Sequence, residues 1–128
     1  MMFPKIERVD HIHIYVADRA AAEQWYRDVL GFRRKKELEV WAVPHGPLML
    51  QNPAGSVVLA LFEKAVQANR STIAFGVTGN DFLEWVKHLA LVLNSPKKPV
   101  DHGLAWSVYF ADPDGNPFEI TTYDYGIL

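Results

Sequence analysis

Cysteine is absent from the 128 residues, and its absence removes several kinds of chemistry at once. Without thiols the chain forms no disulfide, has no thiolate nucleophile and holds no zinc through sulfur. A metal site in this sequence must therefore use nitrogen and oxygen donors. The scarcest of these donors are the imidazoles of the five histidines.

An excess of charge of one sign is also missing. Thirteen Lys and Arg residues stand against fifteen Asp and Glu residues, which gives a formal net charge of −2. The basic residues cluster only at 33–36 and 97–98. A nucleic-acid-binding domain carries a concentrated basic patch. We therefore expect a small molecule, and no nucleic acid, as the partner of this chain.

Long apolar runs and nucleotide-binding loops are lacking as well. No apolar run reaches the roughly 20 residues that cross a bilayer. The opening Met-Met-Phe-Pro-Lys has neither the basic nor the apolar region of a signal peptide. The sequence contains no glycine-rich phosphate loop and no nucleophile elbow. These absences predict a cytoplasmic protein without a membrane partner and without an organic cofactor.

What the sequence does contain is an internal repeat. Asn52-Pro53-Ala54-Gly55 returns as Asp112-Pro113-Asp114-Gly115 at an offset of 60 residues, and the strand-like run 11–16 returns as 72–77 at an offset of 61. Each strand-like run leads into a helix-like segment that contains Trp. Self-similarity at a fixed period indicates two copies of one module. We predict modules at about 5–64 and 70–125, joined near 65–70, within a single domain over 1–128.

The hydrophobic pattern gives both modules the order strand, helix and three strands. Apolar residues recur at helical spacing between Asp18, a helix N-cap, and Gly31, a helix stop. A second helix is expected after a cap at Asn80. The expected strands are 9–16, 37–43, 48–51, 56–62, 71–77, 100–105, 107–111 and 117–123. This order predicts an α+β fold, in which a curved mixed sheet forms a cup or half-barrel with the helices on its outer face.

Strand alternation then assigns side chains to the two faces of the sheet. If Ile12 and Ile14 face the helix, His11 and His13 face the inside of the cup. The repeat offsets place four related positions inside the cup: His11, Leu59, Thr72 and Glu119.

Two runs carry a resemblance to a known family. These runs resemble the two hallmarks of the vicinal oxygen chelate superfamily. The first run is Val9-Asp10-His11-Ile12-His13-Ile14-Tyr15-Val16-Ala17-Asp18. The second run is Ser107-Val108-Tyr109-Phe110-Ala111-Asp112-Pro113-Asp114-Gly115-Asn116-Pro117-Phe118-Glu119-Ile120. That superfamily includes glyoxalase I, the bleomycin and fosfomycin resistance proteins and the extradiol dioxygenases. The resemblance covers nearly the whole chain. It implies a homodimer, with the site at or near the subunit interface.

The resemblance also implies a metal site. Family members commonly hold a divalent metal at the four repeat-related positions, so His11 and Glu119 are expected ligands of Fe, Mn, Ni or Zn. Thr72 and Leu59 occupy the other two positions, and a third ligand must come from elsewhere. His13 shares the face of His11, but residues two apart on a strand lie nearly 7 Å apart. His102, on a neighbouring strand of the second module, is the better geometric candidate.

The resemblance further points to an acid–base group. Tyr109 stands ten residues before Glu119, as does the catalytic tyrosine of the extradiol dioxygenases before its ligand. A phenol at this position can donate a hydrogen bond to a substrate oxygen or transfer a proton, with His102 beside it.

Three functions remain open at this point. The first is a metal-dependent enzyme of the lyase or dioxygenase type, acting on a small oxygen-bearing metabolite. The second is a metal-free protein of the bleomycin-resistance type that sequesters an aromatic or cationic ligand. In such a protein His11 and Glu119 are a structural pair, and Trp41 and Trp106 form walls of the pocket. The third is a dimer without a small ligand. Because His11 and Glu119 are retained, we favour the metal-dependent enzyme by a small margin.

Overall fold

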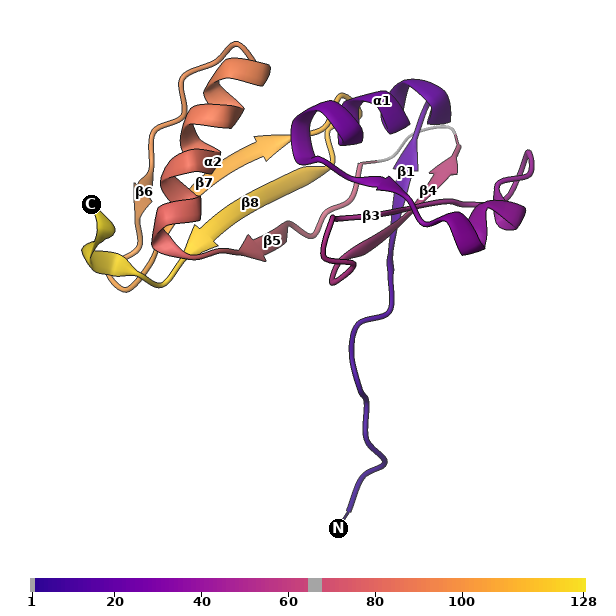
Figure 1. Ribbon diagram of the computed structural model, residues 1–128, viewed down its shortest axis with the longest axis horizontal. Coiled ribbons are helices and arrows are strands. Elements are labelled where there is room, and N and C mark those ends of the chain that lie inside the picture. Colours follow the sequence, from indigo (N-terminus) through magenta and orange to yellow (C-terminus); the bar gives the residue numbers. More distant parts are fainter. Residues whose placement is uncertain (1, 65–67) are drawn as a thin grey trace.

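The computed structural model describes residues 2–64 and 68–128, which form two four-stranded mixed sheets (Figure 1). The two helices lie on the same side of these sheets, α1 packed on β4 and α2 on β8. The predicted α+β fold with two strand–helix–three-strand modules is confirmed. Residues 65–67 of the expected connection lie outside the described residues.

The first module contains β1 (Ile12–Val16), α1 (Arg19–Leu30), β2 (Arg33–Arg34), β3 (Leu48–Gln51) and β4 (Val58–Glu63). Its strand order is β1-β4-β3-β2, and β1 pairs parallel with β4. Both predicted boundaries of α1 are confirmed. The carboxylate of Asp18 accepts a hydrogen bond from the Ala21 N–H at 3.0 Å, and Gly31 ends the helix in the left-handed region with φ 74°.

Two expectations for the first module are wrong. Residues Lys36–Trp41 form a 3-10 helix where a strand was expected at 37–43, because Val40 and Trp41 remain exposed and no sheet face buries the alternating pattern. The first strand begins at Ile12 rather than at residue 9. Residues 2–10 instead form an arm without regular secondary structure that extends away from the body (Figure 1).

The second module repeats the arrangement with β5 (Ile73–Gly76), α2 (Gly79–Val92), β6 (Val100–Asp101), β7 (Trp106–Ala111) and β8 (Pro117–Thr122), followed by a 3-10 helix at Tyr125–Ile127. Its strand order, β5-β8-β7-β6, matches that of the first module. The expected cap at Asn80 is wrong. The hydroxyl of Thr78 caps α2 by accepting a hydrogen bond from the Asp81 N–H at 3.2 Å, so the helix begins two residues earlier in the chain.

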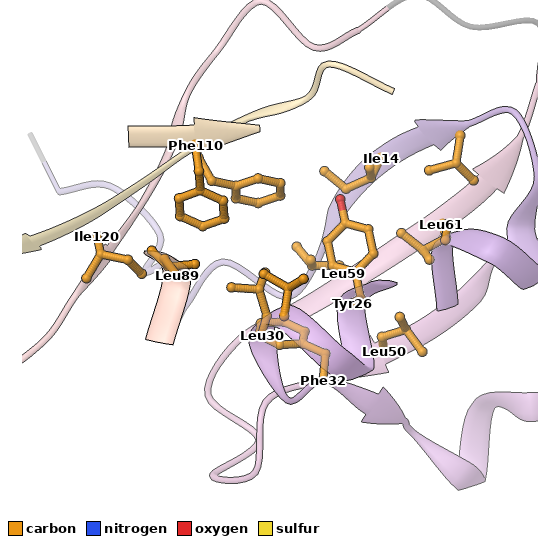
Figure 2. Packing of buried hydrophobic residues seen from close by; sticks show 14 of the residues in the cluster. Ile14, Tyr26, Leu30, Phe32, Leu50, Leu59, Leu61, Leu89, Phe110 and Ile120 are labelled. Atoms are coloured by element: carbon orange, nitrogen blue, oxygen red, sulfur yellow. The ribbon is translucent and has the colours of Figure 1, made fainter. Parts of the chain in front are cut away.

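The core lies between the helices and the sheet faces that they cover (Figure 2). Ile14, Val16, Tyr26, Leu59 and Leu61 are completely buried there. The isoleucines of β1 therefore face the helices, as alternation predicted. None of the helices in the described ranges has the length and apolar character needed to cross a membrane.

The burial of Leu59 overturns its expected place inside the cup. In the register of β1 with β4, Leu59 lies beside Ile12 while Ala60 lies beside His13. In the second module Glu119 lies beside Ala74, so Ala60 is the counterpart of Glu119. The β3–β4 connection, 52–57, is one residue longer than the β7–β8 connection, 112–116. A shift of one residue moves a side chain to the opposite face of a strand. The repeat offset does not account for the longer β3–β4 connection, and it therefore selected Leu59 instead of Ala60.

Candidate functional site

The candidate site is built on the face of the second sheet that points away from α2. Glu119 on β8 pairs with Tyr109 on β7 and with Ala74 on β5, and Ser107 pairs with Thr121. Residues paired across a sheet point to the same face. The predicted placement of these side chains on one face is confirmed.

Glu119 is held in position by a serine from the neighbouring strand. The Ser107 hydroxyl donates a hydrogen bond to Oε2 of Glu119 at 2.7 Å and lies 3.0 Å from the Thr121 hydroxyl. Ser107 is fully buried while Glu119 is half-buried. The buried hydroxyl therefore fixes the orientation of a carboxylate that remains accessible. The sequence offered one signal for this role, the position of Ser107 two residues before Tyr109.

His102 and Tyr109 form a hydrogen-bonded pair beside this carboxylate. The Nε2 atom of His102 lies 2.9 Å from the Tyr109 hydroxyl, and Tyr109 is 43% exposed. His102 reaches the tyrosine because a tight turn follows β6, in which its N–H donates to the Ala105 carbonyl and Gly103 adopts φ 83°. The structure thus brings together the two residues predicted to form the acid–base group.

A charged group stands next to this pair. Asp101 accepts hydrogen bonds from the Gly103 N–H at 2.8 Å and from the Tyr125 hydroxyl. These bonds, the backbone N–H first, hold the pKa of Asp101 below its usual value. The hydrogen bond between Tyr125 and Asp101 raises the pKa of the Tyr125 hydroxyl. Trp106 stacks on Tyr125 and donates to its carbonyl, so this tryptophan packs within the module.

The first module presents a second group of donors at the start of β1. Nδ1 of His11 lies 2.8 Å from Oδ2 of Asp10, and Nε2 of His11 lies 3.2 Å from Nε2 of His13. The two ring nitrogens thus approach each other although the residues are two apart along the chain. The hydrogen bond from His11 holds the pKa of Asp10 below its usual value. An ionised carboxylate only accepts hydrogen bonds, so the proton of the Asp10–His11 contact is on Nδ1 of His11.

The two groups of donors belong to different sheets. His11 precedes β1 of the first sheet, and Glu119 lies on β8 of the second. Within residues 2–64 and 68–128, no three His, Asp or Glu side chains come together in a way that could hold a metal ion. The polar partners of His11 are Asp10 and His13, and that of Glu119 is Ser107. The two residues therefore do not form the structural pair weighed above.

Thr72 occupies the position expected from the repeat. It lies one residue before β5, as His11 lies one residue before β1, and its side chain is exposed. Ala74 likewise corresponds to His13. The second module therefore has no imidazole at either position. His102 is instead hydrogen-bonded through Nε2 to Tyr109, the residue that pairs with Glu119.

The donor types fit a first-row divalent metal. Imidazole nitrogen suits Zn, Ni, Cu and Fe, and carboxylate oxygen suits Mn and Fe. A carboxylate that bonds the distal nitrogen of a ligating histidine is a common outer support of such sites, and Asp10 has this relation to His11. His11 and Glu119, the two predicted ligands, supply these donor types from different sheets of the chain.

Comparison with known proteins agrees with this architecture. The family model described as the Glyoxalase/Bleomycin resistance protein/Dioxygenase superfamily matches residues 8–120. The chain belongs to this superfamily.

Two curated relatives represent different reactions. Biphenyl-2,3-diol 1,2-dioxygenase 3 of Rhodococcus globerulus is 28% identical over 118 residues, which cover 88% of this chain and 62% of the relative. The chain thus spans less than two thirds of the length of that dioxygenase. Metallothiol transferase FosB of Staphylococcus epidermidis is 30% identical over 132 residues, which cover 92% of this chain and 83% of the relative.

Among solved structures, the fosfomycin resistance protein FosX of Listeria monocytogenes superposes with a TM-score of 0.71 at 18% identity, covering 96% of this chain and 98% of that one. A mutant of FosX was solved with Mn(II) and 1S,2S-dihydroxypropylphosphonic acid, and it superposes with a TM-score of 0.69 at 16% identity. These likenesses show a shared fold.

Proposed function

We propose that this protein is a divalent-metal-dependent enzyme that acts on a small metabolite carrying two neighbouring oxygen atoms. The observation that carries the proposal is the arrangement of Glu119. This carboxylate is fixed by Ser107 and lies directly across from Tyr109, whose hydroxyl is hydrogen-bonded to His102. One face thus holds a carboxylate of the kind that binds metal ions and a hydrogen-bonded Tyr–His pair of the kind that transfers protons.

Each side chain has a distinct role in this proposal. His11 and Glu119 hold the ion, which when bound polarises the substrate oxygens as a Lewis acid. Tyr109 donates a hydrogen bond to a substrate oxygen or exchanges a proton with it. His102 accepts the tyrosine proton at Nε2, and Ser107 keeps Glu119 aimed outward from the sheet.

We infer that the ligand set is shared between two copies of the chain. A homodimer with the site at or near its interface, as the family resemblance implies, supplies the His11 group from one subunit and the carboxylate of Glu119 from the other. This pairing is needed because one chain does not assemble three donors within its described residues.

The surroundings of Glu119 favour a neutral substrate. Its neighbours on the same face are Ala74, Ser107, Tyr109 and Thr121, none of which carries a positive charge. A phosphonate needs cationic partners, whereas a vicinal diol binds a metal through two oxygens without them. We therefore place diols, such as catechols, ahead of phosphonates.

A metal-free ligand-binding role is the second candidate. It is favoured by one observation, the presence of Ala60 and Thr72 at two of the four repeat-related positions. This role predicts ligand binding that does not depend on any metal ion.

The test is a turnover assay on protein loaded in turn with Fe(II), Mn(II), Ni(II) and Zn(II). Catechols, 2-oxoaldehyde–thiol adducts and fosfomycin with a thiol are offered, and consumption is followed by NMR. We expect metal-dependent consumption of one class, abolished in Glu119→Gln and reduced at least tenfold in kcat in Tyr109→Phe. Binding of an aromatic ligand, unchanged by a chelator and without turnover, would establish the metal-free role instead.

A further inference from the structure

The feature that the proposed function leaves unused is the contact between two imidazoles. The Nε2 atoms of His11 and His13 lie 3.2 Å apart, with the ring planes 21° from parallel. Both side chains are exposed. His11 can lean onto His13 because it precedes Ile12, the first residue of β1, and its backbone lies outside the strand ladder.

Each of the two imidazole rings has a further contact that limits its movement. Asp10 accepts a hydrogen bond from Nδ1 of His11, which leaves the lone pair of the neutral imidazole on Nε2, facing His13. The ring of His13 packs on Phe62 with centroids 4.7 Å apart, and its carbonyl accepts a hydrogen bond from the Asn69 side chain at 3.3 Å. The Asp10 bond and the Phe62 contact thus orient the two rings, whose Nε2 atoms face each other.

The separation of the two nitrogens fits coordination of one ion. Metal–nitrogen bonds of about 2.0–2.1 Å at angles between 90° and the tetrahedral value place two ligating nitrogens about 2.8–3.4 Å apart. The observed 3.2 Å falls within this interval. Binding then requires that the proton between the rings leave, with Nδ1 of His13 taking up the other tautomer, and that the two exposed rings turn so that both lone pairs meet at one ion.

We propose that His13 is a metal ligand together with His11, and that the pair is a two-imidazole half-site for a borderline divalent ion such as Zn(II), Ni(II) or Co(II). The proposal rests on the proposed function in taking His11 as a ligand. It explains how this chain manages without an imidazole at Thr72 or Ala74: both nitrogen donors come from one segment, 11–13. The site then draws its nitrogen from the first module and its oxygen from Glu119.

The test measures the affinity for Ni(II) by isothermal titration calorimetry. In a separate measurement, the d–d absorption of the Co(II)-loaded protein reports the coordination of the ion. Wild type, His11→Gln, His13→Gln and His45→Gln are compared, because His45 is an exposed histidine in a turn far along the chain from this pair. We expect His13→Gln to weaken Ni(II) binding at least tenfold and to change the Co(II) spectrum. His45→Gln should bind as wild type does. His13→Asn, with a circular-dichroism spectrum for each variant, repeats the measurement should His13→Gln fail to fold.

The outcomes separate the two proposals. If metal binds wild type and is lost in His11→Gln but is unchanged in His13→Gln, the role of His13 is overturned while the proposed function stands. If wild type binds no metal with micromolar or better affinity, both are overturned. Loss of binding in both His variants, with intact folds, supports the two-imidazole site.

Discussion

Tyr26 shows how a single residue ties the two modules together. Its side chain is fully buried on α1, and its hydroxyl donates to Oδ2 of Asp112 at 2.7 Å, across 86 residues of sequence. Asp112 also accepts hydrogen bonds from Asn116 and from the Asp114 N–H. Burial, and after it the charge of Asp112, raises the pKa of Tyr26 far above its usual value, so the phenol stays protonated as the donor. The same Asp-Pro-Asp-Gly segment that marks the repeat is thus the anchor point for α1.

Replacing this hydroxyl should cost stability without touching the site. We expect Tyr26→Phe to lower the free energy of unfolding by about 1–3 kcal/mol, because a buried carboxylate oxygen loses a donor. Urea unfolding followed by fluorescence measures the change. Tyr123→Phe, at a position 80% exposed, is the control and should leave the midpoint unaltered. An unchanged midpoint in Tyr26→Phe would contradict the anchoring role.

At the same scale, the sequence predicted some side-chain positions and missed others. The alternation of apolar and polar residues in β1, β7 and β8 correctly predicted which face carries Tyr109 and Glu119. It could not predict the His11–His13 contact. That contact depends on where β1 begins, and the apolar Val9 extends the strand pattern three residues too far.

Among the elements, α1 and β2 are joined by a charged contact. Arg34 donates from Nε and Nη2 to the two carboxylate oxygens of Glu23 at 2.6 and 2.9 Å. This bidentate bond holds the pKa of Glu23 below its usual value. A carboxyl group with a lowered pKa in the folded state stabilises the fold above its unfolded pKa, and that stabilisation is lost as the pH falls through the folded pKa.

The pH dependence of a variant tests this contact. Glu23→Gln should be less stable than wild type by about 1 kcal/mol or less at pH 7, since Arg34 is partly exposed, and the difference should shrink as the pH falls below the usual range of a glutamate carboxyl. Urea midpoints measured over a series of acidic pH values give the difference. Glu84→Gln, which removes an exposed pair with Lys87, should show no such dependence. A Glu23→Gln deficit that stays constant as the pH is lowered would mean that packing, not charge, sets the cost.

Elements with a strong local signal were predictable, and those decided by tertiary contacts were not. Asp18 and Gly31 fixed the ends of α1 because a cap and a left-handed stop are local chemistry. The 3-10 helix at Lys36–Trp41 replaced an expected strand because Val40 and Trp41 remain exposed and no sheet face buries them. The position of Leu59 was missed through a one-residue difference between two turns.

At the scale of the whole molecule, the arm and the split donor set both point to a second copy of the chain. Phe3, Ile6 and Val9 on the arm are 81%, 87% and 74% exposed, an unusual amount of apolar surface for a segment that extends from the body. We expect a dimer of twice the 14.5 kDa chain mass at micromolar concentration, measured by size-exclusion chromatography with light scattering. A monomer under these conditions would contradict the shared site.

Metal content tests the central claim most directly. Protein purified without an affinity tag or chelator, together with His11→Ala and Glu119→Ala, is analysed by inductively coupled plasma mass spectrometry. We predict close to one Fe, Mn, Ni or Zn per wild-type chain and little in either variant, with both variants folded by circular dichroism. A wild-type protein that stays metal-free after reconstitution with each of these ions would contradict it.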